Sequence, residues 1–238
     1  MDIVYFIKDE LENDALILSL RSLSHIPHDK VFLVGGFPNG VNPETVFHIP
    51  VEQDGGTKYK NTTKMLKLIS KTPEISDKFI LMNDDFMFME DIRDPEEELN
   101  LHRGYVDDII KDYLERYKGQ EHPYVTGMQD TKRVLQGLGY VNPLSYELHI
   151  PIVMHKNNLQ QMFNIPGLDS IPVLHKRTLY GNIYLRNSKY TQDVKMDLHH
   201  PELPENTKFL STSDMYFRQF KPFLLSMFDK PSEYELCN

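Results

Sequence analysis

The chain has 238 residues, of which 40% are hydrophobic and 26% are charged, as is ordinary for a soluble globular protein with a buried core. The formal net charge of −9 argues against a general nucleic-acid-binding protein, which would present a basic surface. The single cysteine, Cys237, excludes an intramolecular disulfide framework and zinc sites built from several thiolates.

The N-terminus carries acidic residues directly after a short apolar stretch, in MDIVYFIKDELEND, and so resembles neither a signal peptide nor a transit peptide. No apolar run approaches the roughly 18 residues that a membrane-spanning helix needs. We therefore expect a cytoplasmic protein without a membrane span.

Apolar runs and helical patterns follow one another over residues 1–92. Leucine, isoleucine and methionine recur at helical spacing in residues 13–26 and 62–72, which predicts two helices, the first capped by Asn13 or Asp14. Short β-rich runs predict strands at residues 2–8, 30–36, 46–51 and 79–83. This order of elements predicts an α/β fold with a mostly parallel sheet flanked by helices.

The pattern changes in residues 93–238. The acidic run at 93–100 is typical of a solvated turn, and residues 105–119 predict an amphipathic helix that ends at Gly119. From about residue 120 the chain is richer in Pro, Gly, His and Tyr, so we expect an irregular α+β portion wrapped against one end of the sheet. With no repeat or low-complexity tract, a single domain of residues 1–238 is expected.

Two adjacent aspartates, Asp84 and Asp85, follow the last of the predicted strands in FILMNDDFMFME. Ligands of open parallel sheets bind at the carboxyl ends of the strands, where this pair is expected to lie. Neighbouring carboxylates repel each other unless a cation lies beside them, and Mg²⁺ or Mn²⁺ typically binds one or two carboxylates together with substrate phosphates. The pair therefore suggests a clamp for a metal ion and a diphosphate.

A turn is the alternative interpretation of this pair, because Asn and Asp at strand ends often satisfy local backbone groups. The continuation FMFME is apolar again, which an ordinary polar loop would not be. We expect Asp85, with Asp84, to bind the metal ion.

Three segments match one known family in order and spacing: NDALILSLRSL (13–23), VFLVGGFP (31–38) and the stretch 58–88 that ends in NDDFMF. They resemble the central block of the Stealth family and, more broadly, the nucleotide-diphospho-sugar transferases of the GT-A fold. The residues that carry the match are Asn13, Leu16, Ser19, Leu20, Arg21, Ser22, Asn83, Asp84 and Asp85. The resemblance implies a GT-A-like fold, a nucleotide diphosphate-sugar donor and a hydroxyl-bearing acceptor such as a glycan. Residues 1–92 would bind the donor and residues 93–238 the acceptor.

Later segments extend the resemblance. YELHIPIVMHK (146–156) is similar to the family's His-x-Pro segment, HKRTLYGN (175–182) to an Arg-containing stretch, and KFLSTSDMYFRQF (208–220) to a late acidic segment. The resemblance implies that Glu147, His149 and Asp214 act in catalysis and that Arg177 binds substrate.

Glu147 and His149 alternate along the chain, so in an extended segment both side chains would point to the same side. One of them can then act as the base for the acceptor hydroxyl, and His149 as a third metal ligand. The alternatives are a core histidine bonded to a backbone carbonyl, and for Asp214 a helix cap.

Donor contacts are expected from both early strands and helices. The carboxyl end of the first strand offers Phe6, Lys8 and Asp9 to the nucleotide, although Lys8 and Asp9 also suit a solvated turn. Arg21 can bind a diphosphate with two hydrogen bonds, or form a buried ion pair.

Lys60 and Asn61 start a helix after a glycine pair, which suits phosphate binding. Asn83, next to the aspartates, completes the predicted donor site. Lys58 and Thr62 could also hold the donor, whereas Lys64, Lys67 and Lys71 are expected on the solvated face of the helix.

Several functions stay open at this stage. Stealth proteins transfer sugar-1-phosphate and open with a Tyr-x-Trp-Val-Asp-Gly-like motif, whereas this chain has no tryptophan and places only Asp9 near that motif's aspartate. We therefore expect a metal-dependent glycosyltransferase, with sugar-1-phosphate transfer as the alternative. A non-catalytic sugar-nucleotide-binding module is a second class. A DNA acceptor would be favoured only by the lysines of residues 58–71 and is opposed by the overall charge.

Overall fold

A five-stranded sheet forms the centre of the molecule, with strand order β3-β2-β1-β4-β7. The computed structural model describes residues 1–53, 57–197 and 208–236. The strands are β1 (Asp2–Ile7), β2 (Val31–Gly35), β3 (Phe47–Pro50), β4 (Lys78–Asn83) and β7 (Ile152–His155). The first four run parallel, and β7 pairs antiparallel with β4 at the edge.

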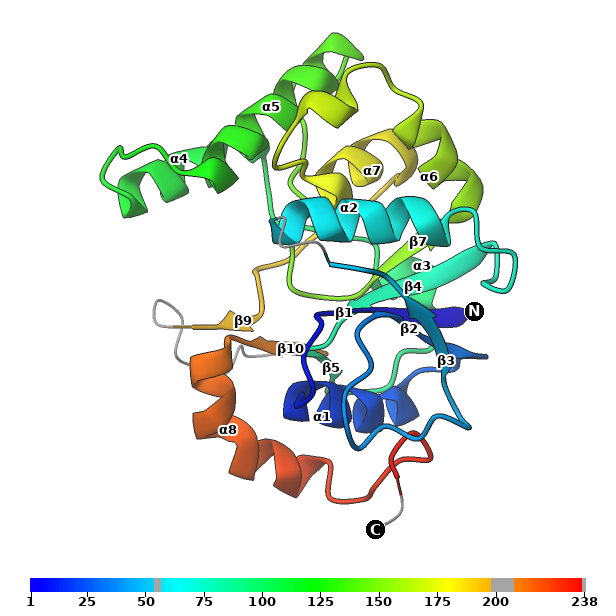
Figure 1. Cartoon of the computed structure of the whole chain (residues 1–238). Coiled ribbons are helices and arrows are strands. Elements are labelled where there is room, and N and C mark those ends of the chain that lie inside the picture. The colour runs from blue at the N-terminus through cyan, green and yellow to red at the C-terminus, as the bar shows by residue number, and fades with distance from the viewer. Residues whose placement is uncertain (54–56, 198–207, 237–238) are drawn as a thin grey trace.

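Helices cover both faces of this sheet (Figure 1). α1 lies on one side and α2, α6 and α7 on the other, with α4 and α5 beyond them. The bounds are α1 (Asp14–Ser22), α2 (Lys58–Ile69), α3 (Pro95–Glu98), α4 (Val106–Arg116), α5 (Pro123–Gly137), α6 (Lys156–Phe163), α7 (Lys176–Tyr184) and α8 (Asp214–Met227), with the 3-10 turns η1 (Leu23–His25) and η2 (Leu168–Ser170). None of the helices in the described part of the chain combines the length and apolar character needed to cross a bilayer.

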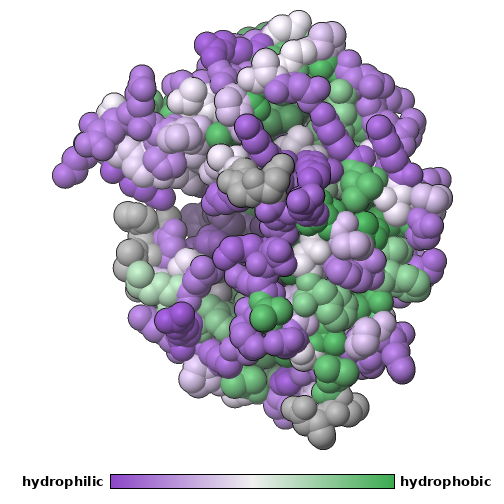
Figure 2. Space-filling view, viewed as in Figure 1, coloured by the Kyte–Doolittle hydropathy of each residue, from purple (hydrophilic) through white to green (hydrophobic). Residues whose placement is uncertain are grey.

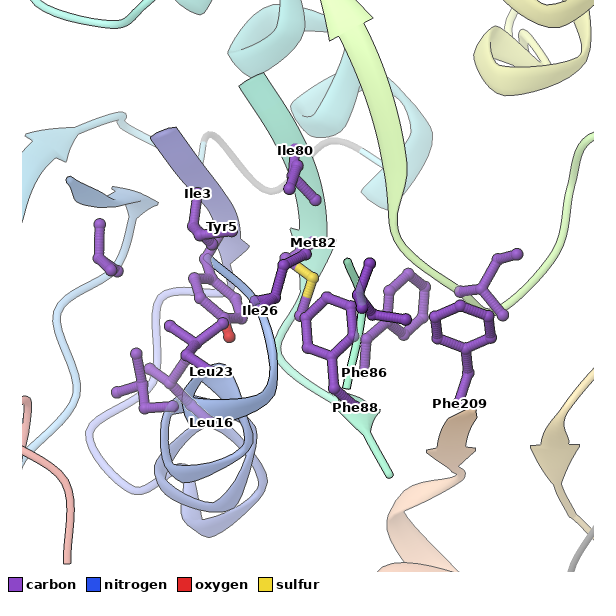
Figure 3. Close-up of a cluster of buried hydrophobic side chains, with 14 of the residues drawn as sticks. Ile3, Tyr5, Leu16, Leu23, Ile26, Ile80, Met82, Phe86, Phe88 and Phe209 are labelled. Atoms are coloured by element: carbon purple, nitrogen blue, oxygen red, sulfur yellow. The ribbon is translucent and has the colours of Figure 1, made fainter. Parts of the chain in front are cut away.

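The strand β1 is buried along its whole length, which explains its uninterrupted apolar sequence. Its alternate side chains serve two cores: Tyr5 packs in the cluster under α1, while Val4 and Phe6 pack in the cluster under α2 and α6. Figure 3 shows the first cluster, in which Leu16 and Leu23 face β1 and aromatic side chains such as Phe86 continue the core sideways.

Two smaller sheets adjoin the central one. One has the order β5-β10-β9, from β5 (Phe86–Phe88), β10 (Phe209–Thr212) and β9 (Lys195–Met196). The other pairs β6 (Leu101–His102) with β8 (Lys189–Tyr190) in parallel. Because β5 follows β4 after a turn at Asp84 and Asp85, the two aspartates lie where the central sheet passes into the second sheet.

The last described residues return to α1. Arg21 binds both carboxylate oxygens of Glu235, at 2.9 and 2.7 Å, and also donates to the carbonyl of Phe228. His28 forms a hydrogen bond of 2.7 Å with the hydroxyl of Tyr234. These contacts fasten the C-terminal segment beneath the first helix.

The predicted fold class is confirmed: the protein is mixed α/β, with a mostly parallel central sheet flanked by helices. The predicted helix at residues 13–26 ends earlier as α1 and passes into η1, and the cap is Asn13, whose side chain accepts from Leu16. The helix predicted at 62–72 begins four residues earlier, at Lys58, because the Thr57 side chain caps it.

The C-terminal portion is more regular than expected. Residues 120–190 form α5, α6 and α7, and β7 joins the central sheet. The acidic run at 93–100, expected as a turn, contains the short helix α3, whose first turn is capped by Asp94. The pairing of β7 with the central sheet could not be predicted from the sequence, because its partner β4 lies some seventy residues earlier in the chain.

Candidate active site

Asp84 and Asp85 form the turn between β4 and β5, and both side chains are half-buried. Asp84 Oδ2 accepts a hydrogen bond of 2.7 Å from Asn13 Nδ2. Burial, together with the negative charge of Asp85, raises the pKa of Asp84 to about 6. The turn therefore concentrates negative charge that the protein neutralises only in part.

Asp85 is bound by side chains of the second sheet, whereas Asp84 is bound by Asn13. Its Oδ2 atom accepts a hydrogen bond of 2.5 Å from the hydroxyl of Ser211 on β10 and lies 3.1 Å from Nζ of Lys195 on β9. The sequence interpretation had assigned no role to either residue.

The helix α1 fixes the backbone that carries these aspartates. Ser19 donates to the carbonyl of Phe86 and bonds to the hydroxyl of Tyr5, and Ser22 accepts from the backbone N–H of Phe88 at 3.1 Å. The first element of the Stealth resemblance, which contains both serines, thus contacts the last element directly. Its polar residues hold the strand after the aspartates in place.

The carboxyl end of β1 reaches the same edge of the sheet. Phe6 is buried beside Asn83 of β4, while Lys8 and Asp9 are exposed just beyond it. A hydrogen bond from Lys8 to Glu10 raises the pKa of Lys8, and the charges of Asp214 and Asp84 raise it further. The charges of Asp84 and Asp214 therefore both act on Lys8, whose direct partner is Glu10.

His149 is oriented by a carboxylate that the sequence interpretation did not identify. The carboxylate of Asp193 accepts two hydrogen bonds from His149, one from its backbone N–H at 2.9 Å and one from its ring nitrogen Nδ1 at 2.8 Å. The guanidinium of Arg103 lies 3.3 Å from the same carboxylate. Burial would raise the pKa of Asp193, but the charge and hydrogen bonds of His149 and the charge of Arg103 hold it well below its usual range. Asp193 is therefore ionised and directs Nε2 of His149 away from itself.

Glu147 lies against the first turn of α7 instead of pointing freely into solvent. Its Oε1 atom accepts the backbone N–H of Thr178 at 3.1 Å and lies 3.8 Å from Nδ1 of His175. That His175 nitrogen is buried and has no hydrogen-bond partner among the described residues.

Arg177 contacts both the segment that carries Glu147 and His149 and the strand that follows the aspartate turn. It donates to the carbonyls of Leu148 and Ile150, and its guanidinium lies 5.7 Å from the ring centre of Phe86. Burial lowers the pKa of Arg177 to about 10, while the charges of Glu147 and Asp193 act in the opposite direction. Glu147 and the pair of His149 with Asp193 thus border the same guanidinium.

The structure places the other predicted substrate contacts, Arg21, Lys60 and Asn61, on the helices α1 and α2. Arg21 is engaged by Glu235 in the last turn of α1, about 12 Å along the helix from Asn13. Lys60 and Asn61 lie in the first turn of α2. Lys176 of α7 donates a hydrogen bond of 3.3 Å to the carbonyl of Tyr59 in the same turn. For Arg21, the ion pair is the interpretation that the geometry favours.

A metal ion would find two carboxylates here. Among residues 1–53, 57–197 and 208–236, no three His, Cys, Asp or Glu side chains come together as a metal site, so His149 does not join Asp84 and Asp85. Two protein carboxylates are enough for Mg²⁺ or Mn²⁺, which completes its coordination with water and phosphate oxygens. The two carboxylates of the turn therefore fit a divalent ion.

The space-filling surface is hollowed on this side of the molecule. Figure 2 shows a recess with hydrophilic walls between the part that carries α4 and α5 and the part that carries β9 and α8. Open α/β sheets bind ligands at the carboxyl ends of their parallel strands, where the two aspartates lie.

Comparison with known proteins finds solved structures of similar fold but assigns this chain to no family. The sequence matches no known protein family and no curated protein, so the resemblance to the Stealth family is not confirmed. The structure is similar to galactosyltransferase LgtC, solved with donor and acceptor sugar analogues, with 11% identity and a TM-score of 0.49 over 98% of this chain and 96% of that one. It is also similar to mouse xyloside xylosyltransferase 1 in its apo form, with 8% identity and a TM-score of 0.44 over 91% of this chain and 99% of that one. Both are glycosyltransferases, and the identities are too low to transfer the role of any residue.

Proposed function

We propose that this protein is a metal-dependent glycosyltransferase, which moves a sugar from a nucleotide diphosphate-sugar to a hydroxyl of an acceptor, a glycan. The observation that carries the proposal is the turn of Asp84 and Asp85 at the carboxyl end of a parallel sheet, where the fold keeps two carboxylates together despite their repulsion. A cationic ligand would relieve the repulsion that remains between them.

Asp84 and Asp85 would hold Mn²⁺ or Mg²⁺, which would neutralise the charge that develops on the departing diphosphate. Phe6, Lys8 and Asp9 at the end of β1 would contact the nucleotide, and Asn83 would support the turn. In this proposal residues 1–92 supply most of the donor site, while residues 93–238 supply the acceptor side and Arg177.

His149 is the better candidate for the base. Its Nδ1–H is donated to Asp193, so Nε2 is left as the acceptor for the proton of the attacking hydroxyl. Glu147 instead accepts a backbone N–H at the start of α7, an interaction that favours a positioning role. Asp214, the first residue of α8, would act on the donor side, where its charge reaches Lys8.

Sugar-1-phosphate transfer is the second candidate, as the resemblance of two segments to the Stealth family implies. Asn13 and Ser19 of the first segment bind Asp84 and Phe86 of the last one. In that reaction the acceptor would attack the β-phosphorus of the donor, and the mass of the product distinguishes the two outcomes.

The test is a thermal-shift screen of UDP-, GDP-, CDP- and TDP-sugars with and without Mn²⁺. A ligand present at 100 times its dissociation constant stabilises the folded state by about 2.7 kcal/mol. We expect one nucleotide class to stabilise the protein only with Mn²⁺, and Asp85→Ala to lose the effect. Asp169→Ala is the matched control, because Asp169 is an exposed aspartate paired with Lys67 on another surface.

Hydrolysis of the nucleotide-sugar in the same samples separates an enzyme from a binding module. Stabilisation by Mn²⁺ and nucleotide without any turnover on a panel of glycan acceptors would favour the non-catalytic alternative. Stabilisation that Asp85→Ala leaves intact would refute the metal site.

A further inference from the structure

Lys195 occupies the position where a cation is expected. Its Nζ atom lies 3.1 Å from Asp85 Oδ2, and both side chains are largely buried, with exposed fractions of 25% and 16%. The Ser211 hydroxyl donates to the same oxygen. Asp85 is therefore already neutralised by a residue of the chain itself.

A divalent ion and the Lys195 ammonium cannot share Asp85 Oδ2 at these distances, because like charges would meet with little water between them. Binding of the ion to this oxygen requires the ammonium to move away. The metal site proposed above thus contains an internal competitor.

The backbone of Lys195 is fixed, so only its side chain can respond. Lys195 pairs with Ser211 in the register of β9 against β10, and its neighbour Val194 is buried in the main core with 2% of its surface exposed. On the other side of Val194, Asp193 is bound to His149. A lysine has a flexible four-carbon stem, so the ammonium can swing to a nearby anion but cannot leave the site.

We propose that Lys195 is the internal counter-ion of the aspartate turn: it neutralises Asp85 while the site is empty and turns to the nucleotide diphosphate when a divalent cation takes its place. This inference rests on the proposed function, since it requires both ligands to bind here. Its consequence is that cation and nucleotide bind cooperatively, each favouring the arrangement that the other needs.

A substitution that removes the Lys195 ammonium separates its competition with the cation from its contact with the diphosphate. In Lys195→Met the cation no longer competes with an ammonium, so Mn²⁺ alone binds more tightly. The nucleotide diphosphate loses a partner, so Mn²⁺ enhances its binding less than in the wild type. Because coupling between two sites is reciprocal, the nucleotide must also enhance Mn²⁺ binding less, by the same factor.

The experiment is isothermal titration calorimetry with Mn²⁺ alone, with UDP, GDP, CDP and TDP alone, and with each nucleotide at saturating Mn²⁺. For Lys195→Met we expect about 5- to 10-fold tighter Mn²⁺ binding and at least a fivefold loss of coupling, within the usual range of coupling factors. Lys189→Met is the matched control, because Lys189 lies earlier in the same stretch and pairs with Glu97 at the surface. It should bind both ligands as the wild type does.

Lys195→Gln provides a second variant that keeps a hydrogen-bond donor and removes the charge. It should reproduce the pattern of Lys195→Met. If the wild type binds neither Mn²⁺ nor any nucleotide, the proposed function fails and this inference fails with it. If the wild type binds both cooperatively and the two variants do the same, the role of Lys195 is refuted while the proposed function stands. Weaker Mn²⁺ binding in the variants would equally refute it.

Discussion

Asp84 carries a carboxylate whose ionisation the fold opposes. Its pKa of about 6, against an ordinary value of 3.8, means that the folded state holds the proton more tightly than the unfolded chain does. Stability is therefore greatest when Asp84 is protonated, and it is lost as the pH rises through about 6.

Asp84→Asn should raise the stability of the ligand-free protein at pH 7.5 while it removes the proposed activity. The shift of about 2 pKa units corresponds to at most about 3 kcal/mol, and each kcal/mol raises Tm by about 2–4 °C in a chain of this size. Thermal unfolding in EDTA at several pH values measures the difference, which should shrink as the pH falls from 6 to 4. Asp169→Asn is the control, and a gain that persists at pH 4 would indicate improved packing instead of relieved charge.

In the proposed reaction Asp193 would act through His149, to which it is hydrogen-bonded. Asp193→Asn replaces the carboxylate that holds the Nδ1–H of His149, so the imidazole would lose its fixed orientation. We expect kcat to fall by about 100-fold or more while the affinity for the donor changes little.

A double variant distinguishes positioning from mere damage to the fold. If Asp193 acts only through His149, then His149→Ala and the combination of both substitutions should lower kcat equally, because the two residues work as one unit. Independent, multiplying losses would contradict this role.

At the scale of elements, α1 and β5 depend on each other through buried hydroxyl groups. Ser22→Ala leaves the backbone N–H of Phe88 without its side-chain acceptor, and an unsatisfied buried donor costs about 1–3 kcal/mol. Chemical denaturation should show this loss, together with weaker Mn²⁺ binding because the turn before β5 relaxes. Ser24→Ala, at an exposed serine that bonds only to the carbonyl of Arg21, should change neither property.

The elements that sequence alone predicts are those with local signals. β1, β2 and β4 are continuous apolar runs, and α1 has both a periodic pattern and a capping asparagine. β7 carries an apolar run of similar kind, yet its assignment depends on a distant partner strand. The helices α5 and α7 were missed because their apolar residues are interspersed with Gly and Tyr, which blur the helical period, and α6 because it is short and begins with polar residues.

The residues of the candidate site also differ in whether a local sequence signal reveals them. The aspartate pair is visible because its residues are adjacent, and Glu147 with His149 because they alternate. Lys195 and Ser211 lie 110 and 126 residues from Asp85, and Asp193 lies 44 residues from His149, so only the folded chain brings them together. Arg21 illustrates the converse, since the sequence suggested a substrate contact and the structure supplies Glu235 as its partner.

At the scale of the whole molecule, the C-terminal segment secures the first helix. Glu235→Ala leaves the largely buried guanidinium of Arg21 with only the Phe228 carbonyl, which should lower the free energy of unfolding by about 1–3 kcal/mol. Denaturant titration measures this, and the affinity for Mn²⁺ and nucleotide should stay unchanged. A loss of nucleotide affinity would instead support a part for Arg21 in the donor site.

One stretch of backbone carries Asp193 and Lys195 on either side of the buried Val194. A shift of this stretch by one residue against β10 would move Lys195 away from Asp85 and Asp193 away from His149 together, and would withdraw the valine from the core. The orientation of the imidazole and the charge at the aspartate turn would then be lost in a single event. Point substitutions can tune these two chemistries one at a time, whereas a change in the length of this stretch would abolish both.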